Sequence, residues 1–465
     1  IRNVYGTLLA DLSIRQDLSA LTKGLAAEAS VSFDNIGGMN ETTNKEYRYM
    51  NSNASITSDG TLVTTPAIYG TDSETLGHTQ PFERLMLRSD FQAKVDYNRT
   101  FGKHQVGGAL IYDMQSVVKN GRNNSQKNQS VLVNATYTYD NRYSLNAVFN
   151  RSGSAYLPDG DKYSNYPAVS AAWIISNEAF MEKVTPINLF KIRASYGLSG
   201  WDGNLSHELW RQSYGSGGAG YNFGVNAGGQ SGGSEGDLPV IGLVAEKSQK
   251  ATFGFDLAAF DNRLNATVEG FYEKRSDILV SGANSTSGII GITVGQVNEG
   301  IYKYKGVDAS LSWNDKIGDF HYGIGASMSY LNTEVVNVNQ AYQEYDYLYT
   351  KGNRIGQMYG LEAIGFFNSQ QEINNSPQQT FSDVAPGDVK YKDQNGDNRI
   401  DEKDIVKMFG SSVPRFYFGF NLNFSYKRLE LSADFQGMTG VTVSLLNSPL
   451  YSPLVSNGNI SNTFL

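Results

Sequence analysis

Apolar and polar residues alternate with a period of two along many short stretches of this chain. The clearest example is residues 414–437, with the sequence PRFYFGFNLNFSYKRLELSADFQG. Every second residue from Phe416 to Tyr426 is apolar or aromatic, and the residues between them are small or polar apart from Tyr417. Such a period predicts a strand with one apolar face and one wet face. Because phenylalanines crowd the apolar face while amides and carboxylates occupy the other, the pattern favours lipid on one side and water on the other.

The same alternation predicts about fourteen strands, arranged as seven hairpins. The connections within the hairpins are mostly short, with Ser176–Asn188 as the longer one, whereas long polar segments join successive hairpins, above all 35–84, 200–249 and 331–415. Short turns at one end and long loops at the other are typical of outer-membrane barrels. We therefore expect an all-β fold, a transmembrane antiparallel β-barrel. A soluble sandwich or propeller is the alternative, but a propeller needs a regular blade repeat, which the sequence lacks. The predicted strands are 6–18, 25–34, 91–97, 106–112, 131–139, 143–149, 166–175, 190–198, 253–259, 264–268, 307–313, 320–330, 416–426 and 429–437.

Composition agrees with a membrane barrel without requiring one. Only 18% of the 465 residues are charged and 12% are aromatic, and the net charge of −8 is spread along the chain. Interspersed charges of this kind predict no nucleic-acid partner. The mean hydropathy of −0.37 is low for a membrane protein, but barrel strands conceal their apolar residues by alternation. With no cysteine, the redox compartment cannot be read from disulfides.

Aromatic residues gather in the long polar segments. They are candidates for stacking on sugar rings or on the side chains of a bound peptide, although packing among the loops and an interfacial aromatic girdle are the alternative explanation. No residues form the pattern of a nucleophile, a base and an orienting third group, so we expect no catalytic activity. The weak candidates for substrate binding are Trp201, Trp210, Tyr214, Tyr345 and Tyr347.

Residues 393–404, with the sequence DQNGDNRIDEKD, have the spacing of a calcium-binding loop. Calcium takes six to eight oxygen ligands, and here five side chains and one backbone carbonyl are spaced to supply them. Asn398 stands at the sixth position, where glycine is usual, and asparagine tolerates the left-handed turn needed there. Asp404 stands at the twelfth, where the longer glutamate is usual. A solvated acidic turn is the alternative. The predicted Ca²⁺ ligands are Asp393, Asn395, Asp397, Asp401 and Asp404, with the carbonyl of Arg399.

Several stretches resemble one known family. They include GDVKYKDQNGDNRIDEKD followed by PRFYFGFNLNFSYKRLELSADFQG, YPAVSAAWIISNEAF with FKIRASYGLSG, DYNRTFGKHQVGGAL, and IGQMYGLEAIGFF. Together they resemble SusC/RagA-type TonB-dependent outer-membrane transporters, in the family's order and over nearly the whole chain. The resemblance implies a 22-stranded barrel in the cell outer membrane, a plug, a short box that contacts TonB, and a SusD-like lipoprotein lid. It also implies active import of glycan or peptide oligomers.

The resemblance also places this chain within the larger barrel. Residues 1–465 are expected to form part of one barrel, most simply its strands six to nineteen, as an internal piece of a longer protein. We expect no plug and no TonB box within this sequence, so contact with TonB would come from a missing N-terminal part. The implied partners are a SusD-like lipoprotein, TonB, outer-membrane lipid and an oligomeric nutrient. The alternative function is that of a structural subunit in a larger outer-membrane assembly.

Overall fold

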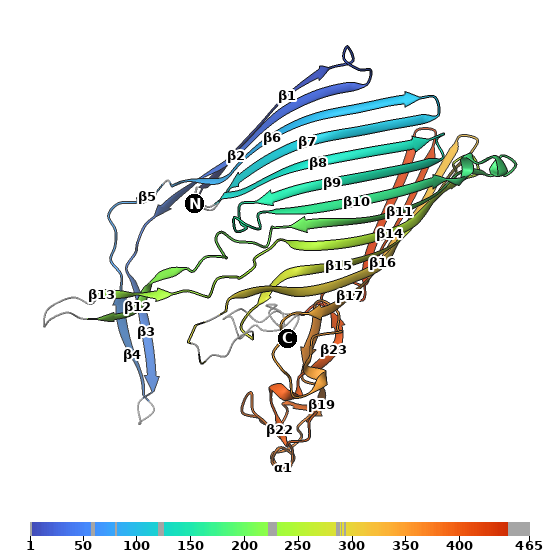
Figure 1. Ribbon diagram of the computed structural model, residues 1–465. Coiled ribbons are helices and arrows are strands. Elements are labelled where there is room, and N and C mark those ends of the chain that lie inside the picture. The colour runs from blue at the N-terminus through green and yellow to red at the C-terminus, as the bar shows by residue number, and fades with distance from the viewer. Residues whose placement is uncertain are drawn as a thin grey trace. The chain divides into compact units, whose positions relative to one another are not determined.

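β-Strands make up most of the part of the chain that the structure describes (Figure 1). The computed structural model describes residues 2–56, 61–79, 81–119, 125–221, 230–284, 289, 291–292 and 294–444. The long strands follow one another, in chain order, along one hydrogen-bonded path. They are β1 (Arg2–Asp17), β2 (Leu25–Asn44), β6 (Phe82–Phe101), β7 (His104–Val118), β8 (Ser125–Tyr139), β9 (Tyr143–Ser154), β10 (Tyr163–Ile174), β11 (Ile187–Trp201), β14 (Glu246–Ala259), β15 (Leu264–Ser281), β16 (Gln296–Ile317), β17 (Phe320–Asn337), β24 (Phe416–Tyr426) and β25 (Leu429–Thr439).

These strands confirm the predicted all-β fold and the seven hairpins, but they are longer than predicted. β2 continues to Asn44 and β17 to Asn337, so each enters a segment that the sequence assigned to a loop. The alternation that marks a strand fades there because both faces carry polar residues, while the backbone ladder continues. The loops expected at 35–84, 200–249 and 331–415 are therefore shorter than their predicted bounds.

Small elements fold within the long loops. Residues 57–60, 80 and 222–229 of the expected loops lie outside the described residues. Among the described residues, no helix is long and apolar enough to cross a membrane. The small elements are β3 (Tyr49–Ile56), β4 (Leu62–Tyr69), β5 (Gly77–Thr79), η2 (Ile175–Asn177), η3 (Ala179–Met181), β12 (Tyr214–Tyr221), β13 (Gln230–Glu235), η5 (Asp346–Leu348), β18 (Gln357–Gly360), β19 (Ala363–Phe366), α1 (Gln370–Asn374), β20 (Gln378–Gln379), β21 (Val389–Tyr391), β22 (Arg399–Ile400), η6 (Glu402–Asp404) and β23 (Val406–Ser411).

The chain divides into two compact units. The first comprises Ile1–Asp96, Leu110–Val131 and Gly153–Ala155. Within it, β1 and β2 pair antiparallel without a break in register. The second comprises Tyr97–Ala109, Leu132–Ser152 and Tyr156–Leu465. Within it, β10, β11, β14, β15, β16, β17, β24 and β25 pair in that order, each antiparallel to the next.

The exposure of side chains on β9 is the reverse of that in a water-soluble sheet. Leu145 and Phe149 are 50% and 47% exposed, whereas the polar Ser144, Asn146 and Asn150 that alternate with them are half-buried. A soluble protein buries its apolar face, because apolar surface in water is costly. An apolar face turned outward and a polar face turned inward are what a lipid-facing barrel wall requires.

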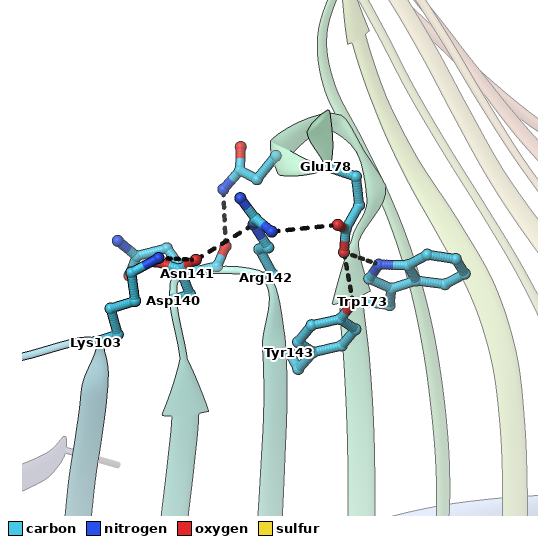
Figure 2. A network of polar contacts seen from close by, with 8 residues as sticks. Lys103, Asp140, Asn141, Arg142, Tyr143, Trp173 and Glu178 are labelled. Atoms are coloured by element: carbon cyan, nitrogen blue, oxygen red, sulfur yellow. Dashed lines mark hydrogen bonds and ion pairs between the residues drawn. The ribbon is translucent and has the colours of Figure 1, made fainter. Parts of the chain in front are cut away.

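At the short-turn end, polar side chains link neighbouring hairpins into a network (Figure 2). The turn between β8 and β9 begins with Asp140 and Asn141, both at a φ of 52°, which two-residue hairpin turns require and asparagine tolerates. The Asp140 carboxylate accepts a hydrogen bond of 2.9 Å from the Lys103 ammonium in the preceding turn. The Arg142 guanidinium lies 3.4 Å from Glu178, in the next connection. The turn between β8 and β9 is thus fixed to the connections on both sides of it.

Glu178 is the centre of this network. Its Oε1 accepts hydrogen bonds from the Tyr143 hydroxyl at 2.6 Å and from Trp173 Nε1 at 3.0 Å (Figure 2). The hydrogen bond from Tyr143, followed by the one from Trp173 and the charge of Arg142, lowers the pKa of Glu178 below its usual value of 4.5. These donors stabilise the carboxylate form, because a charged acceptor makes the stronger hydrogen bond.

We expect this network to loosen only in acid. Since the folded-state pKa of Glu178 is lowered, its stabilisation is fully present above the usual value of 4.5 and is lost as the pH falls through the lowered value. The Trp173 indole N–H resonance, followed by NMR between pH 7 and pH 2, should therefore shift with a midpoint below that value. Glu178→Gln, which still accepts hydrogen bonds but does not titrate, should abolish the shift. A midpoint at or above the usual value would contradict the assignment.

Candidate functional site

Charged and aromatic side chains gather on the wet face of β14, β15 and β16, near the long-loop end. Arg275 lies at their centre. Its Nε donates a hydrogen bond of 2.6 Å to Glu273, and its Nη1 lies 3.6 Å from Glu246. Its guanidinium also stacks over the ring of Tyr304, 5.0 Å from the centroid. This group, which we call the Arg275 cluster, therefore carries aromatic surface and hydrogen-bonding groups, with its guanidinium compensated by carboxylates.

Register brings one predicted residue to the Arg275 cluster. Trp201, at the end of β11, pairs opposite Glu246, and alternation therefore places it on the same face. Its side chain is 54% exposed. An exposed indole beside paired charges offers a stacking surface together with hydrogen-bond donors and acceptors, which suits the polar and apolar faces of a sugar ring or a peptide.

Further along the same face, a second charged group joins β11, β14 and β15. Asp256 lies 3.0 Å from the Lys191 ammonium and 3.4 Å from Arg193, and Arg193 also contacts Glu269. Thr267 donates a hydrogen bond of 3.2 Å to Asp256. The wet face thus carries paired charges at several positions along these strands, as expected of a barrel wall that faces a water-filled lumen.

A small apolar core holds the loop between β11 and β14. Leu243 is its fully buried centre, and Trp210 packs against it from the side. The guanidinium of Arg211 lies 4.3 Å from the Trp210 ring centroid. For Trp210, loop packing is therefore the observed role, whereas Tyr214 in the same loop is exposed. The core members are Leu157, Leu205, Val240, Leu243 and Ala245.

Tyr345 and Tyr347 lie together in the loop between β17 and β24. Their rings stack with centroids 5.4 Å apart and planes inclined by 13°. The Tyr347 hydroxyl donates a hydrogen bond of 2.7 Å to the carbonyl of Lys403, which joins the pair to the acidic 393–404 loop. Burial, followed by the negative charge of Asp404, raises the pKa of Tyr347, so this hydroxyl stays protonated and remains a donor.

The 393–404 loop is closed by its own carboxylates. Asp393 accepts hydrogen bonds from the backbone N–H groups of Gly396 at 2.6 Å and Asn398 at 2.9 Å. Asn398 has a φ of 64°, the left-handed conformation that the sequence required at this position. Asp404 is fully buried, and both of its oxygens accept from backbone N–H groups, those of Gln394 and Asp401.

The oxygens of this loop are thus of the kind that calcium prefers, but they are engaged with the backbone. Within the described residues, no three His, Cys, Asp or Glu side chains are grouped as a metal site. Asn395 and Asp397, at positions three and five, bond to each other or to nearby backbone. Calcium binding therefore stays a prediction.

We expect calcium to protect residues 388–410 from limited proteolysis while leaving the strands intact. Extracellular calcium modules bind at about 10⁻⁴–10⁻³ M, so millimolar calcium should suffice and a chelator should speed cleavage. The variant with both Asp393→Asn and Asp397→Asn should be cut at the chelated rate in either buffer. Equal cleavage of the native loop with calcium and with chelator would show that it is only an acidic turn.

The amino-acid sequence matches the model of a known family. The sequence model of the family described as TonB dependent receptor-like, β-barrel, matches residues 5–447. The chain belongs to this family. Membership confirms the outer-membrane barrel predicted from alternation, and it agrees with the outward apolar face of β9.

Proteins of the SusC/RagA type are among the relatives and solved structures to which this chain is similar. TonB-dependent receptor P26 of Formosa agariphila is 30% identical over 315 residues, which are 65% of this chain and 31% of the relative. TonB-dependent receptor SusC of Bacteroides thetaiotaomicron is 22% identical over 71% of this chain and 32% of its own length. The structure of the RagAB peptide transporter has a TM-score of 0.70 at 16% identity, covering 94% of this chain and 48% of that one. The chain therefore spans about a third of these relatives and about half of that structure.

The sequence did not reveal the Arg275 cluster. Its members come from three strands, and the predicted strand 264–268 ended before Glu273. A residue pattern was nevertheless present beyond the predicted end. The polar residues Glu269, Glu273 and Arg275 are two or four positions apart, so they share one face of a strand. Their meeting with Glu246 depends on the register between strands, which alternation in one strand does not specify.

Proposed function

We propose that this chain forms part of the wall of an outer-membrane active transporter. The transporter imports glycan or peptide oligomers, with energy supplied through TonB. The observation that supports this most is the family match over residues 5–447 together with a wet face that carries the Arg275 cluster. Porin-like diffusion needs no such binding surface, whereas active import begins with a bound ligand.

The long loops support a partner at the outer surface. Tyr214, Ile364, Phe366 and Phe409 are exposed apolar or aromatic residues in the loops before β14 and β24, and exposed groups of this kind favour protein contacts. We place these loops on the extracellular side and propose a SusD-like lipoprotein lid as their partner. The short turns, with the Glu178 network, would then face the periplasm.

The test uses the full-length protein purified gently from its own membranes. Native mass spectrometry should find a lipoprotein bound to it and an oligomer of sugars or amino acids that co-purifies. Uptake of the identified oligomer by cells should stop when TonB or the proton gradient is removed. A barrel that purifies without a lipoprotein would contradict the proposed lid. An assembly that purifies intact, but whose removal from the cells leaves uptake unchanged, would favour the alternative of a structural subunit.

Trp201→Ala should lower the affinity of the full-length transporter for that oligomer. Aromatic contacts of this type contribute about 0.5–1.5 kcal/mol, so uptake at low concentration should fall roughly two- to tenfold. Trp313→Phe is the matched control, because Trp313 lies on the apolar face of β16, opposite Leu264. An equal loss in both variants would assign the effect to folding, and no loss in Trp201→Ala would remove this residue from the binding surface.

A further inference from the structure

Two arginines at the root of the loop between β17 and β24 have no acidic partner within the described part of the chain. Arg354 lies in this loop and Arg415 immediately precedes β24. The Arg354 Nη2 donates a hydrogen bond of 2.8 Å to the carbonyl of Val413, two residues before Arg415. Both side chains are half-buried, and the Nε of each is buried without a hydrogen-bond partner. Among the described residues, neither guanidinium has a carboxylate within ion-pair distance.

The segment that follows β25 does not supply the missing acid. Residues 445–465 lie outside the described part of the chain, and they contain no aspartate and no glutamate. Elsewhere, arginines that lie between strands are matched by carboxylates. Arg193 contacts Asp256 and Glu269, and Arg275 contacts Glu246 and Glu273 in the same way. Arg354 and Arg415 differ from these arginines because no described carboxylate lies within ion-pair distance of them.

Hydrogen bonds hold the backbone of Arg415 and that of the residue next to Arg354. The Arg415 N–H donates to Thr439 at 3.1 Å, and its carbonyl accepts from Leu331 at 2.8 Å. Next to Arg354, the Ile355 N–H donates to the Thr333 hydroxyl at 3.1 Å. The backbone at or next to each arginine is therefore held in place where the loop meets β17 and β24. Because preorganised donors lose little entropy on binding, such an arrangement favours a ligand.

The two positive charges also act on each other. Burial, and then the nearby positive charge of Arg415, lower the pKa of Arg354. Two like charges in a partly dry place repel each other, and their unpaired N–H groups lack the hydrogen bonds that water would give. An anion between them would remove both penalties.

We propose that Arg354 and Arg415 form a binding site for one oxyanion group, a sulfate, phosphate or carboxylate. The planar fork of arginine matches two oxygens of such a group. An acidic nutrient and a lipid headgroup carry the same chemistry, and the experiment separates these sources. The proposal goes beyond the import function and does not depend on it. Since Arg354 belongs to the loop and Arg415 to the root of β24, a bound anion would fasten the loop to the sheet.

The probe is inorganic sulfate, added to the full-length protein in phosphatidylcholine nanodiscs. Isothermal titration at constant ionic strength, with chloride as the replaced anion, should detect one site. Arg354→Gln and Arg415→Gln should each weaken sulfate binding by roughly tenfold or more, because each removes a charged hydrogen-bonding fork. Arg415→Lys, which keeps the charge but loses the fork, should retain part of the affinity. Arg263→Gln is the matched control, since Arg263 pairs with Asp315 at 3.3 Å in a turn.

Two further arms identify the source of the anion. Competition with sulfate by nanodiscs that contain a phosphate-monoester lipid would assign the site to a headgroup. Competition by a sulfated oligosaccharide, but not by its neutral counterpart, would assign it to a soluble ligand. The proposal is overturned if the native protein binds sulfate no better than the double Arg354→Gln, Arg415→Gln variant. It is overturned equally if Arg263→Gln loses as much sulfate affinity as the variants of Arg354 and Arg415. It is also overturned if the glutamine variants lose the native far-UV circular dichroism spectrum while Arg415→Lys binds sulfate as tightly as the native protein, because the loss would then come from unfolding.

Discussion

Leu422→Arg should destabilise the barrel by about 2–4 kcal/mol, the cost of an arginine on the lipid face near the middle of a bilayer. Leu422 pairs with Ile324 on β17 and with Ala433 on β25, so all three lie on the apolar face. The guanidinium would be surrounded by hydrocarbon. Urea titrations of the full-length protein, folded into lipid vesicles, should measure the loss as a lower midpoint.

Asn423→Arg is the matched control one residue away. Asn423 pairs with Gly323 and Ser432, and these three residues line a cavity on the wet face with a volume of about 880 Å³. An arginine there has both room and water, so its cost should be small. Equal losses for the two variants, or the larger loss for Asn423→Arg, would remove the basis for assigning one face to lipid.

The sequence was sufficient to predict the parts of the strands whose outer face is apolar. There, every second residue must be apolar, so the pattern in a single strand such as 416–426 reports both the strand and its faces. Beyond those parts the requirement ends. β15 was predicted to stop at Val268, but it runs to Ser281, because hydrogen bonds to β14 and β16 hold it without apolar alternation.

The candidate sites could be predicted only in part, because they depend on contacts between distant segments. Trp201 is exposed, whereas Trp210 packs against the loop core. This difference depends on which residues form that core, and the pattern of a single strand does not show it. The stacked Tyr345 and Tyr347 could be expected to be close, since they are two residues apart. Their hydrogen bond to Lys403, more than fifty residues later, could not. The sequence singled out these aromatic residues, but it did not distinguish packing from binding.

The loop core around Leu243 lies next to the strand ends that carry Glu246 and Arg275, and it helps to hold them in position. Asn298 on β16 donates hydrogen bonds to the carbonyls of Val244 at 3.2 Å and Asp277 at 2.7 Å. These bonds connect the end of the loop to β15 and β16, two residues along the chain from Glu246 and from Arg275. A change that loosens the core should therefore free the loop without unfolding the sheet, because the ladder from Glu246 onward is independent of it.

Leu243→Ala should open this loop. Truncating a buried leucine costs about 2–5 kcal/mol, since it leaves a cavity, and Leu243 is fully buried. The Val240 amide, which donates to Leu209 at 2.9 Å, should then exchange its hydrogen roughly thirtyfold faster or more. Ile241→Ala is the matched control, because Ile241 is 95% exposed and its removal leaves no cavity. Unchanged exchange at Val240 in Leu243→Ala, or equal acceleration in both variants, would show that the apolar core does not hold the loop.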